Sequence, residues 1–108
     1  MIRTALIIGA GVAGPAAAIA LQKADIDATI FETKPTGADG IGVFLTLGSN
    51  GVDALRVLRA DESVMAAAFS TPAIGLRSAT GKHLGQTRTG RSLSDGTTSQ
   101  TIKRVDLY

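Results

Sequence analysis

The stretch from Leu6 to Gly14 reads LIIGAGVAG and decides how the first part of the chain folds. The apolar run predicts a β-strand over residues 4–8, and the glycine-rich turn leads into a helix predicted over residues 12–24. A second strand is predicted over residues 28–32, where it ends on Glu32. This order of elements is the full context of the G-x-G-x-x-G motif, which binds the ADP part of dinucleotides. It consists of a strand, a glycine turn, a helix and a second strand that ends on an acid.

Each glycine of the motif has a separate physical role. Gly9 allows the tight turn from strand to helix. Gly11 lets the main chain approach a diphosphate without a β-carbon in the way, and Gly14 lets the helix lie close to the strand. The N–H groups and the positive dipole end of the helix then form an anion site. The predicted cofactor-binding residues of the turn are Gly9, Ala10, Gly11, Val12, Ala13 and Gly14.

Glu32 is the predicted partner of the ribose. It stands 18 residues after Gly14, near the spacing expected for the acid that holds the ribose hydroxyls. A carboxylate at this position repels the 2′-phosphate of NADP, so the sequence favours FAD or NAD as the ligand. Thr33 and Lys34 follow directly and complete the predicted site. Lys34 is near enough to steady a phosphate or the adenine edge, and a solvated surface lysine is the alternative interpretation.

Composition narrows the possible functions. The chain has 108 residues, enough for one small domain, and 44% of them are apolar. A net charge of +2 is too weak to indicate a nucleic-acid partner. With no cysteine and one histidine, the chain offers no pattern of metal ligands. We predict no metal site and no catalytic acid, base or nucleophile, because His83 falls in a predicted hairpin and is expected at the surface.

An uncharged run over residues 5–21 follows Arg3 and has the composition of a signal peptide or a short membrane helix. Its glycines and Pro15, however, are spaced for a nucleotide-binding turn and are unfavourable in a continuous apolar helix. In the first turn of a helix the missing N–H of a proline is tolerated. We therefore predict no membrane association and a cytoplasmic location.

Residues 35–51 combine five glycines with bulky apolar side chains, which is too apolar for a flexible linker. Two interpretations stay open for this segment. It is either a buried extended segment that passes close to a ligand or to another backbone, or an irregular strand with bulges.

Beyond this segment the sequence predicts two helices, a hairpin, a loop and a last alternating stretch. Ser49 or Asn50 is expected to cap the first helix, and Asp61 the second. In the last stretch, Ile102 and Arg104 are expected on one face of a strand. The predicted ranges are 51–59 and 61–69 for the helices, 73–77 and 83–87 for the hairpin strands, 88–99 for an exposed loop and 100–105 for the last strand.

The predicted fold class is α/β, with a Rossmann-like βαβ unit followed by two helices and a β-hairpin. Two parallel strands and one helix leave an open sheet edge and uncovered apolar faces, so we expect an incomplete domain from a larger protein. The predicted organisation is a nucleotide unit over residues 1–34, the glycine-rich segment and helices over 35–72, and the hairpin and final element over 73–108.

The chain resembles the N-terminal part of the FAD-dependent monooxygenases of the aromatic-hydroxylase type, close to the branch that includes tetracycline-inactivating monooxygenases. Three blocks carry this resemblance and together span nearly the whole chain. They are residues 7–21 running on to Phe31-Glu32, residues 39–45 with 49–55, and residues 102–107 with their Arg-x-Asp-Leu sequence. Departures from the family pattern leave the subfamily and the substrate open, and they fall at Pro15, Asp25, Lys34 and Ser49.

The resemblance implies where a cofactor binds. FAD would lie at the glycine turn, with Glu32 on the adenosine ribose and the segment from Gly40 to Leu45 near the flavin side of the pocket. Arg104 matches the family arginine that reaches the FAD, a role that suits a charged fork. An edge-strand arginine in solvent is the alternative for that residue.

The resemblance also implies an activity for the complete protein. Such an enzyme uses NAD(P)H and O2 to oxygenate a small organic substrate, here aromatic or polyketide-like, and needs the remaining C-terminal part as a partner for this otherwise inactive piece. The alternative function is an NAD-binding Rossmann module without oxygenase activity. That alternative predicts a third βα unit after Glu32, whereas the sequence has the glycine-rich segment there.

Overall fold

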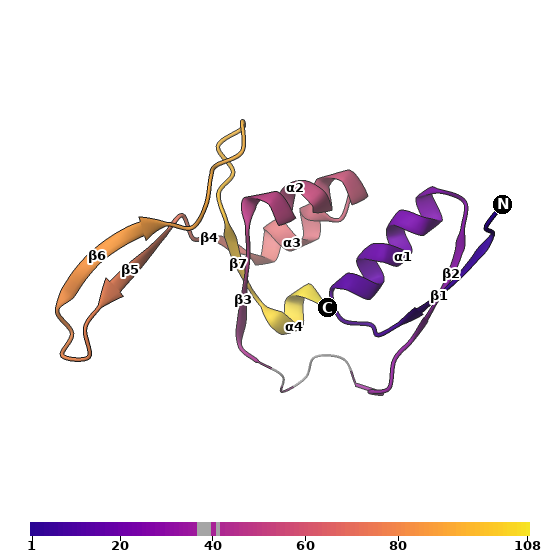
Figure 1. The fold of residues 1–108 in the computed structure, drawn as a ribbon, viewed down its shortest axis with the longest axis horizontal. Coiled ribbons are helices and arrows are strands. Elements are labelled where there is room, and N and C mark those ends of the chain that lie inside the picture. The colour runs from indigo at the N-terminus through magenta and orange to yellow at the C-terminus, as the bar shows by residue number, and fades with distance from the viewer. Residues whose placement is uncertain (37–39, 41) are drawn as a thin grey trace. The chain divides into compact units, whose positions relative to one another are not determined.

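The computed structural model describes residues 1–36, 40 and 42–108, and it divides into two compact units. Unit 1 comprises Met1–Val43 together with Arg104–Tyr108, and unit 2 comprises Phe44–Lys103. Figure 1 labels the helices and strands of both units along the chain. Together they make a mixed α/β structure of small sheets and helices, in agreement with the predicted fold class.

Unit 1 begins with two parallel strands and the helix that connects them. Strand β1 (Thr4–Ile8) pairs with β2 (Asp27–Phe31), and α1 (Ala13–Lys23) lies along both of them (Figure 1). Exposure alternates along each strand as a two-residue period requires. The less exposed set faces α1 and consists of Ala5, Ile7, Ala28 and Ile30.

The turn between β1 and α1 depends on two glycines. Gly9 has φ +104°, in the region that side chains disfavour. A β-carbon on Gly14 would lie 1.9 Å from the carbonyl oxygen of Gly9 and 3.4 Å from a methyl of Ile7. The first turn of α1 is thus in backbone contact with the end of β1, a separation that only glycine permits.

The other end of α1 closes with Asp25, which has φ +58°. Its N–H donates to the carbonyl of Gln22 at 3.1 Å, and the N–H of Ile26 donates to that of Leu21 at 3.0 Å. A residue in the left-handed conformation commonly ends a helix, and aspartate is among the few besides glycine that adopt it. This explains how Asp25 replaces the glycine that is common before the second strand.

The face of the β1–β2 pair opposite α1 is apolar and exposed. Leu6 is 72% exposed, Ile8 83% and Phe31 51%. Nothing in the described part of unit 1 packs over these three side chains, in keeping with a sheet that has a helix on one side.

Unit 2 has a small antiparallel sheet with order β3-β7-β4, two helices and a separate β5–β6 hairpin. In Figure 1, α2 and α3 lie side by side. Its buried apolar residues are Val52, Val64 and Ile102. The bounds of its elements are β3 Phe44–Leu47, α2 Ser49–Leu58, α3 Asp61–Ala67, β4 Phe69–Ser70, β5 Ala73–Arg77, β6 His83–Arg88 and β7 Gln100–Lys103.

The predicted helix caps are wrong. Helix α2 follows Gly48, and the hydroxyl of Ser49 donates instead to the carbonyl of Arg91 at 2.5 Å. Asp61 is the first helical residue of α3 rather than its cap. The Ser49 hydroxyl thus meets a partner 42 positions along the chain, which competes with a local capping bond.

The predicted last strand is too long. β7 ends at Lys103, which pairs with Phe44 at the first position of β3. The next residue, Arg104, opens the short helix α4 (Arg104–Leu107) and donates its N–H to the carbonyl of Val43 at 3.1 Å. Ile102 is therefore a buried strand residue and Arg104 a helical one, so the expectation that they share one strand face is wrong.

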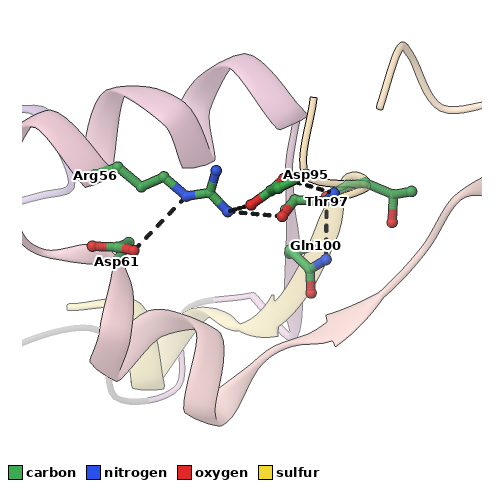
Figure 2. A network of polar contacts seen from close by, with 6 residues as sticks. Arg56, Asp61, Asp95, Thr97 and Gln100 are labelled. Atoms are coloured by element: carbon green, nitrogen blue, oxygen red, sulfur yellow. Dashed lines mark hydrogen bonds and ion pairs between the residues drawn. The ribbon is translucent and has the colours of Figure 1, made fainter. Parts of the chain in front are cut away.

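The loop between β6 and β7 is held to α2 by Arg56 (Figure 2). One guanidinium nitrogen lies 2.8 Å from the Asp95 carboxylate and 2.7 Å from the Thr97 hydroxyl, and another lies 3.9 Å from Asp61. The end of the loop is buried rather than exposed as predicted, since Ser99 is 2% accessible. The Ser99 carbonyl accepts the N–H of Thr71, 28 positions earlier, a contact that a local sequence pattern cannot anticipate.

The contact at Gly14 gives a direct test of the fold. Gly14→Ala should lower the free energy of unfolding by about 3 kcal/mol, the upper end for overpacking, because the nearest atom is rigid backbone. Gly51→Ala in α2 is the matched control, because its β-carbon would meet nothing nearer than 4.0 Å. The control should be neutral or stabilising by up to about 1 kcal/mol. Urea denaturation followed by circular dichroism measures both, and equal effects would contradict the close contact.

Asp95 predicts a pH dependence of stability. The pKa of this exposed carboxyl falls from 3.8 to about 2, first because Thr97 donates to it and then through Arg56. Since the folded pKa is the lower one, the carboxylate stabilises the fold above its ordinary pKa, and that stabilisation is lost as the pH falls toward about 2.

Asp95→Asn should therefore flatten the decrease in urea midpoint between pH 6 and the acid range. Asp53→Asn, at an exposed carboxylate within α2, serves as the control. An Asp95→Asn variant whose midpoint falls with pH as steeply as that of the original chain would rule out this role.

Candidate functional site

The glycine turn and Glu32 lie together at the carboxyl ends of β1 and β2. The parallel register pairs Ile8 with Phe31, so the residues that follow each strand are neighbours. The N–H of Gly9 donates to the carbonyl of Phe31 at 2.7 Å and extends this contact by one residue. Ligands of open α/β sheets bind outside this edge, which makes the turn the first candidate for a site.

The Glu32 side chain points at the turn. One carboxylate oxygen accepts the N–H of Ala10 at 2.8 Å, and the other accepts the N–H of Lys34 at 2.9 Å and the hydroxyl of Thr33 at 3.2 Å. The bond from Ala10, followed by that from Lys34, holds the pKa of Glu32 below its ordinary value. The carboxylate is thus ionised and fixed beside the turn, although it is exposed to solvent.

The start of α1 supplies donors to the same place. Val12 is the N-cap, and the first N–H groups of any helix, here including those of Ala13 and Gly14, have no acceptor within it. Pro15 has no N–H and occupies one of these positions without loss. An eleven-residue helix also places its positive dipole end here.

Helix α4 brings two further side chains to unit 1's turn. The guanidinium of Arg104 donates from Nη2 to the Tyr108 hydroxyl at 2.8 Å and from Nε at 3.1 Å. A β-carbon on Gly11 would lie 3.6 Å from the Tyr108 ring, and one on Gly42, which has φ +68°, would lie 3.3 Å from Cδ of Arg104. Arg104 therefore lies between the Gly42 backbone and a tyrosine that covers Gly11.

Tyr108 is the residue that the sequence analysis missed. Arg104 and Tyr108 stand four positions apart, the spacing that places two side chains on one face of a helix. The alternation over residues 100–105 predicts a strand, and a strand does not bring these two side chains together.

The predicted site residues differ in how far they come together. Gly9 to Gly14 and Glu32 form one cluster, Thr33 joins it through its hydroxyl, and Lys34 joins it through its main-chain N–H with an exposed side chain. Of the predicted segment from Gly40 to Leu45, Ile41 lies outside the described residues. Val43 and Phe44 are more than half exposed, so the interpretation of this segment as buried is wrong for them.

The described residues give less support to a site at the opposite edge of the sheet, to a metal site or to a membrane-spanning helix. A shallow depression lined by Met1–Arg3 and Ala24–Asp27 lies at the amino ends of the strands, the edge where such sheets do not bind ligands. Within residues 1–36, 40 and 42–108, no three acidic, histidine or cysteine side chains cluster as metal ligands. Over the same residues, no helix has the length and apolar character needed to cross a membrane.

No model of a known protein family matches the chain, and no curated protein does. Several solved structures match the chain. The tetrameric form of 2-methyl-3-hydroxypyridine-5-carboxylic acid oxygenase matches with a TM-score of 0.79 and 24% identity, over 98% of this chain and 27% of that one. HpxO of Klebsiella pneumoniae, in complex with FAD and uric acid, matches with a TM-score of 0.74 and 23% identity, over 97% of this chain and 26% of that one.

The tetracycline destructase Tet(55) matches with a TM-score of 0.65 and 25% identity, over 99% of this chain and 26% of that one. At this level of identity the likeness is one of fold, and it confirms the fold implied by the resemblance to FAD-dependent monooxygenases. The chain spans about a quarter of the length of the structures that it matches.

The Glu32 contacts predict a local effect that needs no ligand. Glu32→Ala should speed hydrogen exchange at the Ala10 amide, because its acceptor at 2.8 Å is removed. Thr33→Ala removes only a hydroxyl at 3.2 Å and should leave that amide nearly unchanged. Amide exchange measured by NMR distinguishes the two variants, and equal protection of Ala10 in both would show that Glu32 does not hold the turn.

Proposed function

We propose that this chain is the FAD-binding N-terminal portion of a flavin-dependent monooxygenase. The observation that carries the proposal is the ionised Glu32 carboxylate held 2.8 Å from the Ala10 N–H, beside the start of α1. The fold shared with oxygenases, one of them solved with FAD, supports FAD as the nucleotide.

The residues present fit an ADP group. Gly11 has no β-carbon where a diphosphate would approach the main chain, and the N–H groups of Ala13 and Gly14 supply donors. The Glu32 oxygen that accepts from Ala10 has a single donor and a second lone pair, so a ribose hydroxyl can donate to it as well. The site matches the charges of ADP. The positive end of the helix faces the negative diphosphate, and the carboxylate accepts from the hydroxyls of the sugar.

The parallel β1-α1-β2 unit would act as a Rossmann-like nucleotide-binding unit, with Gly9 to Gly14 and Glu32, Thr33 and Lys34 as its binding residues. Arg104 would add a guanidinium fork for a phosphate oxygen. Bound FAD supplies the redox chemistry of oxygen transfer, and this chain's residues bind and orient it. No residue of the chain is assigned as an acid, base or nucleophile.

For the whole protein we propose an enzyme that takes NAD(P)H, O2 and a small organic substrate, aromatic or polyketide-like, in the cytoplasm. The remaining C-terminal part would supply the substrate and nicotinamide sites. An NAD-binding module without oxygenase activity is less well supported. It calls for a third βα unit after Glu32, whereas β3 joins an antiparallel sheet with β7 and β4.

Binding of ADP-ribose to the purified chain tests the proposal. Glu32→Ala should weaken binding by ~1–3 kcal/mol, the scale for a lost charge-assisted hydrogen bond, as measured by isothermal titration calorimetry. Asp27→Asn, at the opposite end of β2, is the matched control and should bind normally. A 2′-phosphate on the ribose should reduce binding to the original chain and much less to Glu32→Ala.

Two results would contradict the assigned role. One is equal binding of ADP-ribose by Glu32→Ala and the original chain. The other is the same preference against the 2′-phosphate in both. A second measurement distinguishes FAD binding from binding of NAD alone. The chain is mixed with FAD and passed through gel filtration, and flavin absorbance that elutes with the chain shows FAD binding.

A further inference from the structure

Tyr108 lies on the surface that the proposed diphosphate would use. Its ring is 3.6 Å and its hydroxyl oxygen 3.8 Å from the position that a β-carbon on Gly11 would take. The proposed function requires this position to be clear, because the diphosphate approaches the main chain there. One side chain and one ligand group therefore have the same place to occupy.

Tyr108 also engages the cation that a phosphate would use. The phenol oxygen accepts from two nitrogens of Arg104, at 2.8 and 3.1 Å, and the guanidinium carbon lies 5.5 Å from the ring centre. Two guanidinium N–H donors converge on this one oxygen, and the same donors are available to a phosphate oxygen. The phenol oxygen thus takes the bonding position of a phosphate oxygen.

We propose that Tyr108 competes with the diphosphate of a bound nucleotide for the surface of Gly11 and for the guanidinium of Arg104. The inference rests on the proposed nucleotide site and adds a residue that sets its affinity. A diphosphate wins this competition because charge-assisted bonds to guanidinium are stronger than bonds to a neutral phenol. A small anion lacks the adenosine contacts at Glu32. It therefore gains less binding free energy and does not displace Tyr108.

Movement of Tyr108 is feasible in the structure. Tyr108 is 44% exposed and directly follows helix α4, which ends at Leu107. Its contacts are with Arg104 and with the edge of the glycine turn rather than with a packed core. A change of side-chain rotamer would release Gly11 and leave Arg104 free to meet the ligand.

The chain offers a direct probe, because Tyr108 is its one tyrosine. A chain labelled with 3-fluorotyrosine gives a single ¹⁹F resonance that reports this ring. On titration with ADP, the resonance should shift and saturate at the same ADP concentration as the heat of binding. ADP binding that leaves the resonance unchanged would overturn the proposal while the proposed function stands.

Affinity gives the second readout. Tyr108→Ala should bind ADP about three- to tenfold more tightly than the original chain, because every molecule is then competent to bind. Tyr108→Phe, which keeps the ring and removes the acceptor, should fall between them. Val105→Ala, in helix α4 with an exposed side chain, is the control and should bind like the original chain.

The outcomes separate the two proposals. ADP binding by Tyr108→Ala that equals or falls below that of the original chain overturns the competition and leaves the nucleotide site in place. Binding by Tyr108→Ala alone supports the nucleotide site and overturns the claim that a diphosphate displaces Tyr108 in the original chain. Binding by no variant, Tyr108→Ala included, overturns both.

Discussion

The first unit depends on the absence of a side chain at position 14. A β-carbon there would lie 1.9 Å from the carbonyl oxygen of Gly9, so α1 can begin against the end of β1 only if that residue is glycine. This contact fixes where the helix starts and therefore where its free N–H groups point. It also brings the turn close enough to β2 for the N–H of Gly9 to reach the carbonyl of Phe31.

Electrostatic features follow from this backbone arrangement. The helix start is a positive end, and Glu32 is placed one strand away because Ile8 and Phe31 are paired. The Ala10 N–H lowers the pKa of the carboxyl, and the carboxylate in turn holds the turn that donates to it. The result is a donor-rich site next to an acceptor, which is the arrangement that an ADP group needs.

The sequence predicts the parts of the structure that are set by neighbouring residues. β1, α1 and β2 lie within a residue or two of their predicted bounds, because the glycines and the apolar periodicity act locally. The hairpin of β5 and β6 is predicted for the same reason.

Features set by distant pairing are not predicted. The end of β7 is determined by where β3 begins, so Arg104 is helical although the alternation continues through it. Ser99 is buried where its hydroxyl donates to the carbonyl of Thr89 and its carbonyl accepts from the N–H of Thr71. The position of Tyr108 depends on helix α4, where the sequence predicts a strand. For β7 and for Ser99 the deciding contacts join residues far apart in the sequence, whereas Arg104 and Tyr108 are four positions apart and are related by a helical pattern only.

A crystal structure of the chain with ADP tests the central claim most directly. The account predicts the diphosphate at the N–H groups that begin α1, over Gly11, with the ribose hydroxyls within hydrogen-bond distance of the Glu32 carboxylate. ADP bound elsewhere, or a Glu32 side chain turned away from the sugar, would contradict it.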